Sequence, residues 1–223
     1  MNENWPKAYK KGKQNFYGRD FVVSPDVLIP RPETETIIDE VMLLAGKPYL
    51  PGMKTPEQKL SDEPLILDVG TGSGCIAITL KKELPKAEVV GLDISSKALQ
   101  VARLNAEKLE AKVDFVGSDL LSSYSGLEPD VIVANLPYVD ENWEWLDKKA
   151  LGYEPALALY AKNHGLELIF RLVNEAKGFC TWLILEADPC QHAQIIEYAS
   201  LQDFSHEKTS GFVLVFRGTN LTM

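Results

Sequence analysis

The sequence has few of the residues that form disulfides or bind metals. It contains 3 cysteines and 3 histidines among 223 residues, and Cys75, Cys180 and Cys190 show no C-x-x-C spacing. An odd, scattered set of cysteines predicts neither a disulfide framework nor a zinc cluster. The histidines are equally scattered, so no metal site is expected. We interpret the cysteines as the reduced thiols of a cytoplasmic protein.

Long apolar runs and an excess of positive charge are also missing. No stretch approaches the length that spans a bilayer, and the polar start "MNENWPKAYKKGKQ" has no apolar signal region. The formal net charge is -9, with 23 Lys+Arg against 32 Asp+Glu. Nonspecific binding to nucleic acid needs basic patches, so this balance favours a protein or small-molecule substrate. Neither a membrane nor nucleic acid is an expected partner.

The N-terminal part predicts a small extension ahead of the main domain. Residues 21–23 and 27–29 are expected to form two short strands around a Ser-Pro-Asp turn, which makes a β-hairpin. The following "ETETIIDEVMLLAG" has apolar residues at helical spacing and a glycine stop, so a helix over 33–45 is expected. We divide the chain into an N-terminal extension with the hairpin (1–32) and a larger domain (33–223).

A loop and then a regular alternation of strands and helices follow. Prolines and charges without periodicity predict a mobile loop over 46–63. From residue 65 the pattern predicts strands at 65–69, 88–93, 112–117, 130–135 and 181–187, and helices at 75–83, 96–109, 165–177 and 190–201. Such alternation predicts an α/β fold with a mostly parallel sheet covered by helices on both faces. The last two segments, 203–208 and 211–218, are joined by a short turn and add an antiparallel terminal strand.

The first chemical motif is "LILDVGTGSGCIAI", a strand, a glycine loop and a helix. Gly70, Gly72 and Gly74 leave the backbone bare where an open sheet binds nucleotide-like ligands. A dinucleotide fingerprint would have its third glycine where Cys75 stands. Together with Asp68 at the strand end, the loop instead resembles the nucleotide-binding loop of S-adenosylmethionine-dependent methyltransferases.

Acidic residues end the next two strands at the same edge. Asp93 follows the glycine loop by about twenty residues, the interval at which a carboxylate accepts hydrogen bonds from ribose hydroxyls. Asp119 can accept from an adenine amino group while Leu120 covers the ring. Each feature alone also fits turn or helix-capping chemistry. Three successive strand ends with suitable residues favour cofactor binding.

The fourth strand ends in "VANLPY". Asn135-Leu136-Pro137-Tyr138 resembles the [N/D]-P-P-[Y/F/W] motif of methyltransferases that act on planar nitrogen, either adenine amino groups or the side-chain amide of glutamine. The Asn135 side-chain oxygen and the Leu136 carbonyl are then two acceptors for one NH2 group, and Tyr138 gives the substrate a flat face. The alternative is a simple turn that closes a strand.

The stretch "FVVSPDVLIPRPETE" indicates which of the two methyl acceptors, adenine or glutamine, is expected. It closely resembles the bacterial release factor glutamine methyltransferases, as do "YEPALALYAKNHGLELI" and "GFVLVFRG". The resemblance implies a class I methyltransferase (Rossmann-like) fold with a seven-stranded sheet, and N5-methylation of the glutamine in the GGQ tripeptide of release factors. The cofactor contacts that it implies are Asp68, Gly70, Thr71, Gly72, Ser73, Gly74, Asp93, Ile94, Asp119, Leu120 and Asn135. The catalytic and substrate contacts are Asn135, Leu136, Pro137 and Tyr138, with Arg31 and Glu33 as substrate contacts or, equally, as structural charges.

The chain departs from that family in three places. Only "WPKAYKKGKQNFYG" precedes the signature where the family carries a helical domain, so a separate subunit is an expected partner beside the release factor. Leu136 replaces a proline, and Ala187-Asp188 replaces a His-Gly pair. Two other functions stay open: N6-methylation of adenine in RNA or DNA, and a non-catalytic module that binds the cofactor or a partner.

Overall fold

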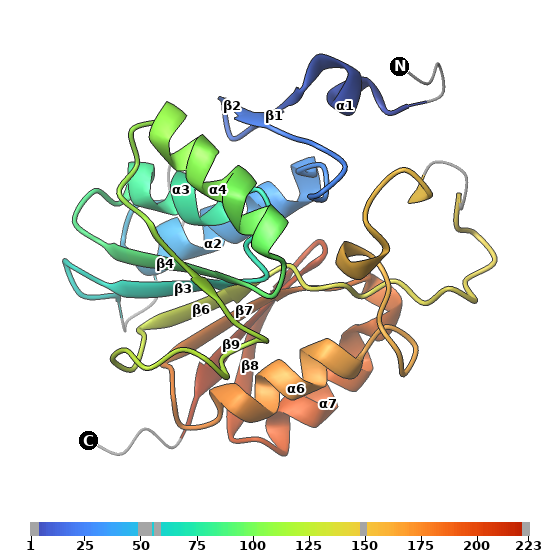
Figure 1. The fold of residues 1–223 in the computed structure, drawn as a ribbon. Coiled ribbons are helices and arrows are strands. Elements are labelled where there is room, and N and C mark those ends of the chain that lie inside the picture. Colours follow the sequence, from blue (N-terminus) through green and yellow to red (C-terminus); the bar gives the residue numbers. More distant parts are fainter. Residues whose placement is uncertain (1–4, 49–54, 56–58, 148–150, 220–223) are drawn as a thin grey trace.

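The computed structural model describes residues 5–48, 55, 59–147 and 151–219 (Figure 1). The predicted loop over 46–63 lies largely outside the described residues. The described part contains a two-stranded sheet and a seven-stranded sheet. The strands are β1 Lys13–Phe16, β2 Arg19–Val22, β3 Leu65–Val69, β4 Glu88–Asp93, β5 Asp114–Gly117, β6 Val131–Ala134, β7 Trp182–Glu186, β8 Phe204–Ser210 and β9 Val213–Gly218. The helices are α1 Lys7–Lys11, α2 Glu35–Leu44, α3 Cys75–Glu83, α4 Ser96–Lys108, α6 Glu167–Ala176 and α7 His192–Ser200, with short 3-10 turns at Pro32–Thr34, Ala156–Ala158 and Pro189–Gln191.

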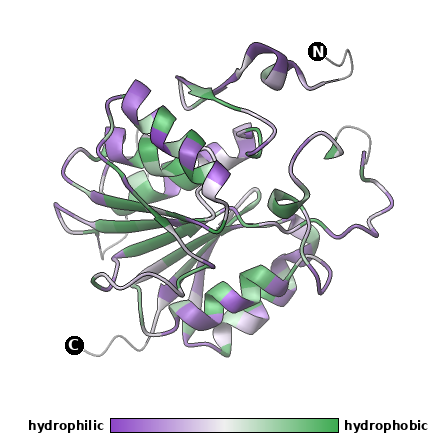
Figure 2. Ribbon diagram, in the orientation of Figure 1, coloured by the Kyte–Doolittle hydropathy of each residue, from purple (hydrophilic) through white to green (hydrophobic). Residues whose placement is uncertain are grey.

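The large sheet has the strand order β5-β4-β3-β6-β7-β9-β8. Strands β3 to β7 pair in parallel, and β9 runs antiparallel to both of its neighbours. The predicted mostly parallel, seven-stranded sheet with an antiparallel terminal strand is confirmed. Every residue of β3, β6 and β7 is buried, as expected for strands covered on both faces, and Figure 2 shows these strands as the hydrophobic centre.

Helices cover the two faces of the sheet separately. One apolar cluster joins α2 and α3 to the sheet, and another joins α6 and α7 to its opposite face. Helix α6 is strongly amphipathic, with Ile169, Leu172 and Val173 buried against the strands. The helix boundaries predicted from periodicity are close to those observed. No described helix is long and apolar enough to cross a membrane.

The N-terminal part does contain a β-hairpin, but the prediction of which segments pair in it is wrong. Strand β2 pairs with β1 and not with residues 27–29, which form no strand. The reversal occurs at Tyr17-Gly18, both with positive φ (47° and 75°), the geometry that suits a two-residue hairpin turn. The side chain of Asn105 on α4 holds the hairpin, because it accepts from Val22 N at 2.7 Å and donates to Val22 O at 3.0 Å.

The C-terminal hairpin turns later than expected. Strand β8 continues through Ser210, so the reversal lies at Gly211-Phe212 and not over 209–211. Strand β9 then inserts between β7 and β8. The parallel strands end together at one edge of the sheet. From β3 the chain adds β4 and β5 on one side and then β6 and β7 on the other. Open α/β sheets bind ligands at the point where the strand order changes direction in this way.

Candidate functional site

A cavity of about 270 Å³ opens at this edge of the sheet. It is lined by the glycine loop after β3, the ends of β4 and β6, and the segment that precedes α2. Most of the predicted site residues line it: Arg31, Gly70, Thr71, Gly72, Ser73, Asp93, Ile94, Asp119, Leu120, Asn135, Leu136 and Pro137. Asp68, Gly74, Glu33 and Tyr138 do not.

The glycine loop meets the fourth strand end directly. Gly70 has φ +77°, and a Cβ there would lie 3.0 Å from Leu136 Cδ2. Gly74 also has positive φ (+78°), but its Cβ position faces Ile78 at 2.9 Å and Ala102 at 3.2 Å. Gly70 therefore allows the loop to approach the motif around Leu136, whereas Gly74 allows α3 and α4 to pack.

Asp68 lies beneath the loop and not in the cavity. Its Oδ2 accepts from the Thr71 hydroxyl at 2.6 Å and from Ala77 N at 3.1 Å. Burial raises the pKa of this carboxyl to about 7, against the two hydrogen bonds that lower it. The described contacts make Asp68 an anchor of the glycine loop.

Asp93 holds the same loop from the second strand end. Its Oδ2 accepts from Gly72 N and its Oδ1 from Ser95 N, both at 2.8 Å. Burial raises the pKa of Asp93, while these two bonds lower it. Since the carboxylate also lines the cavity, it has lone pairs for ligand hydroxyls as well. Ile94 lies at the rim with 59% of its surface exposed.

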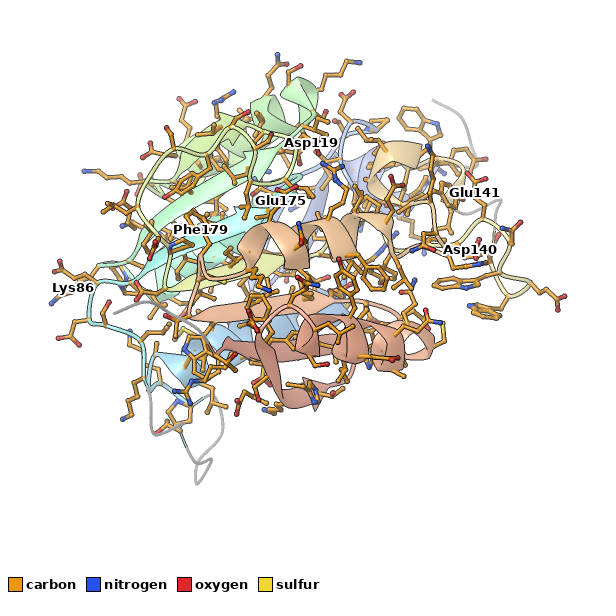
Figure 3. All side chains as sticks on the ribbon, turned by 90° about the horizontal axis from the view of Figure 1, so that it is seen from below. Lys86, Asp119, Asp140, Glu141, Glu175 and Phe179 are labelled. Carbon is orange, nitrogen blue, oxygen red and sulfur yellow. The ribbon has the colours of Figure 1, made fainter. Side chains whose placement is uncertain are left out.

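Asp119 is held by an arginine that sequence reasoning missed. Arg171 Nη2 lies 3.0 Å from Asp119 Oδ2 and 3.8 Å from Glu175 Oε1. The two acidic residues are labelled in Figure 3. The i,i+4 spacing of Arg171 and Glu175 on α6 was visible in the sequence, but the contact to Asp119 was not. Leu120, which follows Asp119, is buried and has positive φ (51°).

Asn135 is tied to the segment before α2. Its Nδ2 donates to Thr34 Oγ1 at 3.0 Å, and Thr34 is almost fully buried. Leu136 is buried against the glycine loop, and Pro137 lines the cavity. Thr34 was missed as a site residue because its partner lies 101 positions away in the chain.

A second cavity of about 120 Å³ adjoins the first. Tyr138 and Glu186 line it from the ends of β6 and β7. The Tyr138 hydroxyl donates to Glu186 Oε1 at 3.2 Å. Burial and the neighbouring Glu186 raise the pKa of Tyr138, so the phenol stays protonated. Five residues line both cavities: Leu28, Arg31, Asn135, Leu136 and Ala158.

Arg31 forms an ion pair with Glu154, which the sequence did not predict as its partner. Glu154 is buried, and its other oxygen accepts from Ile29 N at 2.9 Å. The pair fastens the entry segment to the loop after β6, while Arg31 still lines both cavities. Glu33 lies in the 3-10 turn and lines neither.

The loop that follows Tyr138 extends away from the sheet. It begins and returns at a bridge between Val139 and Tyr160. Trp143 and Trp145 stack on each other with ring centroids 5.2 Å apart, and Trp145 is 66% exposed. Figure 3 shows Asp140 and Glu141 on this loop, beyond the end of α6.

Several solved structures with this architecture are methyltransferases. One from Pyrococcus furiosus matches with TM-score 0.63 at 19% identity, covering 90% of this chain and 89% of that chain. A 16S rRNA methyltransferase of T. thermophilus, solved with AdoMet and guanosine, matches with TM-score 0.63 at 16% identity, over 93% of this chain and 50% of that chain. The chain therefore has the class I S-adenosylmethionine-dependent methyltransferase fold, as predicted.

Sequence relatives are more specific. Residues 53–147 match the family model "Methyltransferase small domain". Proteins named release factor glutamine methyltransferase are 47% identical in Koribacter versatilis, 36% in Enterococcus faecalis and 40% in Bacillus subtilis, over 75%, 78% and 78% of this chain. The chain is a homologue of these proteins, and the resemblance seen in its motifs is confirmed. It spans 56%, 58% and 58% of their respective lengths.

Proposed function

We propose that the chain binds S-adenosylmethionine in the larger cavity and methylates the side-chain nitrogen of the glutamine in the GGQ motif of peptide chain release factors, in the cytoplasm. The observation that carries this proposal is the meeting of the two cavities at Asn135 and Leu136. A substrate amide in the smaller cavity is then next to a cofactor in the larger one. The names of the relatives favour glutamine over adenine as the acceptor.

The larger cavity fits the cofactor chemically. The bare backbone at Gly70 and Gly72 admits a ligand close to the loop, and the Asp93 carboxylate accepts from ribose hydroxyls. Leu120 offers apolar cover to the adenine ring beside Asp119. When bound, S-adenosylmethionine supplies an electrophilic methyl group on a sulfonium. Asp68 supports the loop from below.

The residues of the NLPY motif act on the nitrogen. An amide nitrogen is a poor nucleophile because its lone pair is delocalised into the carbonyl. The Asn135 side-chain oxygen and the Leu136 carbonyl accept from the same NH2 group and favour a tetrahedral nitrogen. Preorganised contacts of this kind are typically worth about 3 kcal/mol in the transition state. Tyr138 lines the cavity that receives the amide and restricts its rotation.

The test is transfer of labelled methyl groups to purified release factors. We expect label on wild-type release factor and none on a variant whose GGQ is changed to GGA. Label on neither protein, while RNA becomes labelled, would replace the proposal by adenine methylation. Calorimetry with S-adenosylmethionine is the companion measurement, and an absence of binding would leave only the non-catalytic alternative.

A further inference from the structure

Glu186 is a buried carboxyl that the proposed mechanism has not used. It ends strand β7, beside β6, and only 2% of its surface is exposed. It lines the smaller cavity together with Asn135, Leu136 and Tyr138. A carboxyl in this position costs solvation free energy unless its oxygens find donors.

In the described part of the chain, one of the two oxygens has a donor within hydrogen-bond geometry. Oε1 accepts from the Tyr138 hydroxyl at 3.2 Å. Oε2 is buried and has no donor within hydrogen-bond geometry among the described residues, although the side chains of Thr34 and Asn135 lie near enough to the carboxyl to lower its pKa. A buried acceptor left unpaired loses its hydration without compensation, which destabilises the empty site. A donor on a ligand in the smaller cavity removes this cost, and an amide NH2 group is such a donor.

The surroundings of Glu186 favour proton uptake. Burial raises its pKa most, and the side chains of Thr34, Tyr138 and Asn135 oppose this increase. Glu33 raises the pKa further through charge repulsion. Two more groups lie near the carboxyl. Arg31 lines the same cavity. Burial raises the pKa of the Cys75 thiol most, and the charge of Glu186 adds to that increase.

We propose, resting on the function proposed above, that Glu186 is the proton acceptor of the reaction. Its Oε2 accepts a hydrogen bond from the N–H of the substrate amide. As the nitrogen forms its bond to the methyl carbon and the sulfur–methyl bond breaks, the nitrogen becomes cationic. It then releases one proton to Oε2. The products are the N-methylated amide, neutral S-adenosylhomocysteine and a protonated Glu186, which returns its proton to solvent after product release.

The principal test is Glu186→Gln, which keeps the shape and removes the basic oxygen. We expect kcat to fall about 100-fold, within the usual range for loss of a positioned base. The affinity for S-adenosylmethionine should stay within about threefold. Wild-type kcat should fall with decreasing pH through a single ionisation, and this acidic limb should be absent from the variant. An unchanged pH profile and kcat in Glu186→Gln would overturn the proposal.

A second readout does not depend on turnover. In protein labelled with ¹³C at the glutamate carboxyls, one resonance that is missing from Glu186→Gln should titrate well above the ordinary range for glutamate. Adding a GGQ peptide together with S-adenosylhomocysteine should shift that resonance. A titration at an ordinary pKa, or no response to the peptide, would contradict the proposal. Should Glu186→Gln fail to fold, Glu186→Asp serves both measurements and should keep the acidic limb.

Two further variants separate proton transfer from support of Tyr138. Tyr138→Phe removes the hydroxyl that bonds Oε1 and leaves Oε2 in place. If Glu186 only positions Tyr138, both single variants and the double variant should lose the same activity and all keep the acidic limb, which would overturn the proposal. Glu40→Gln is the matched control, because Glu40 is as buried but pairs with Lys208 and lines neither cavity. Wild-type protein that labels no release factor would instead reject the proposed function itself.

Discussion

Asn135 donates through Nδ2 to Thr34 Oγ1 at 3.0 Å, which joins the end of β6 to the turn that precedes α2. The bond uses one amide donor and so determines which way the Asn135 side chain is turned. The segment "LIPRPETE" is therefore part of the site through Thr34, and not only through its charged residues. Arg31, which lines both cavities, and Thr34, which lines the larger one, belong to the same short turn.

The first prediction concerns this bond. Thr34→Val keeps the shape of the side chain but removes the acceptor, so the Asn135 amide is free to rotate. We expect kcat for release factor methylation to fall about tenfold, which corresponds to about 1.4 kcal/mol, with unchanged cofactor affinity. Thr34→Ser restores the hydroxyl and should recover most of the rate. Equal activity of the Val and Ser variants would show that the bond does not matter.

Removing the Asn135 side chain is a stronger test. Asn135→Ala should abolish measurable turnover while the affinity for S-adenosylmethionine stays within about tenfold, because the side chain acts mainly in the transition state. Calorimetry and single-turnover methylation measure the two effects separately. Asn142→Ala, in the loop beyond Tyr138, is the control and should keep normal kinetics. Loss of folding in Asn135→Ala, seen by circular dichroism, would instead assign Asn135 a structural role.

Asp93 should determine cofactor affinity. Asp93→Ala removes an acceptor for ribose hydroxyls and also frees Gly72 N, which the carboxylate now holds at 2.8 Å. Hydrogen bonds to charged groups contribute about 1.5–3 kcal/mol each, so we expect the Kd to rise about 100-fold. Asp114→Ala is the matched control, because Asp114 begins β5, the strand next to β4, and so lies at the sheet edge opposite Asp93. A Kd that changes equally in both variants would reject the assignment.

The pKa of Asp68 makes stability depend on pH. The folded pKa is about 7 against an ordinary value of 3.8, so protonated Asp68 stabilises the fold and this contribution is lost as pH rises between the two values. Each pH unit within that window changes the free energy of unfolding by about 1.4 kcal/mol. Asp68→Asn should therefore be most destabilised, relative to wild type, below about pH 4, and the difference should narrow as pH rises through 7. Urea unfolding across this range measures it, and a constant difference would contradict the shift.

The sequence was sufficient for the central sheet because strands β3, β6 and β7 are continuous apolar runs, each ended by a glycine, an asparagine or an acidic residue. Local signals failed where two pairings competed. The "FVV" strand has the apolar segment 27–29 on one side and the mostly polar segment 13–16 on the other, and the Tyr17-Gly18 turn selected the polar one. Contacts between side chains far apart in the chain were also inaccessible. Arg171 with Asp119 and Thr34 with Asn135 depend on how helices and loops meet at the sheet edge, which periodicity does not specify.

The Arg31–Glu154 ion pair should contribute to the stability of the fold, because one of its two partners is buried. Glu154 has only 4% of its side chain exposed, whereas Arg31 has 35%. Arg31→Met leaves the Glu154 carboxylate buried without its cation, although Ile29 N still donates to it. Because Arg31 is partly solvated, the loss should be nearer about 1–2 kcal/mol than the value for a fully buried pair. Thermal and urea unfolding should show this loss. The double variant Arg31→Met with Glu154→Gln removes the unpaired charge and should be more stable than Arg31→Met alone; if it is not, the pair does not anchor the entry segment.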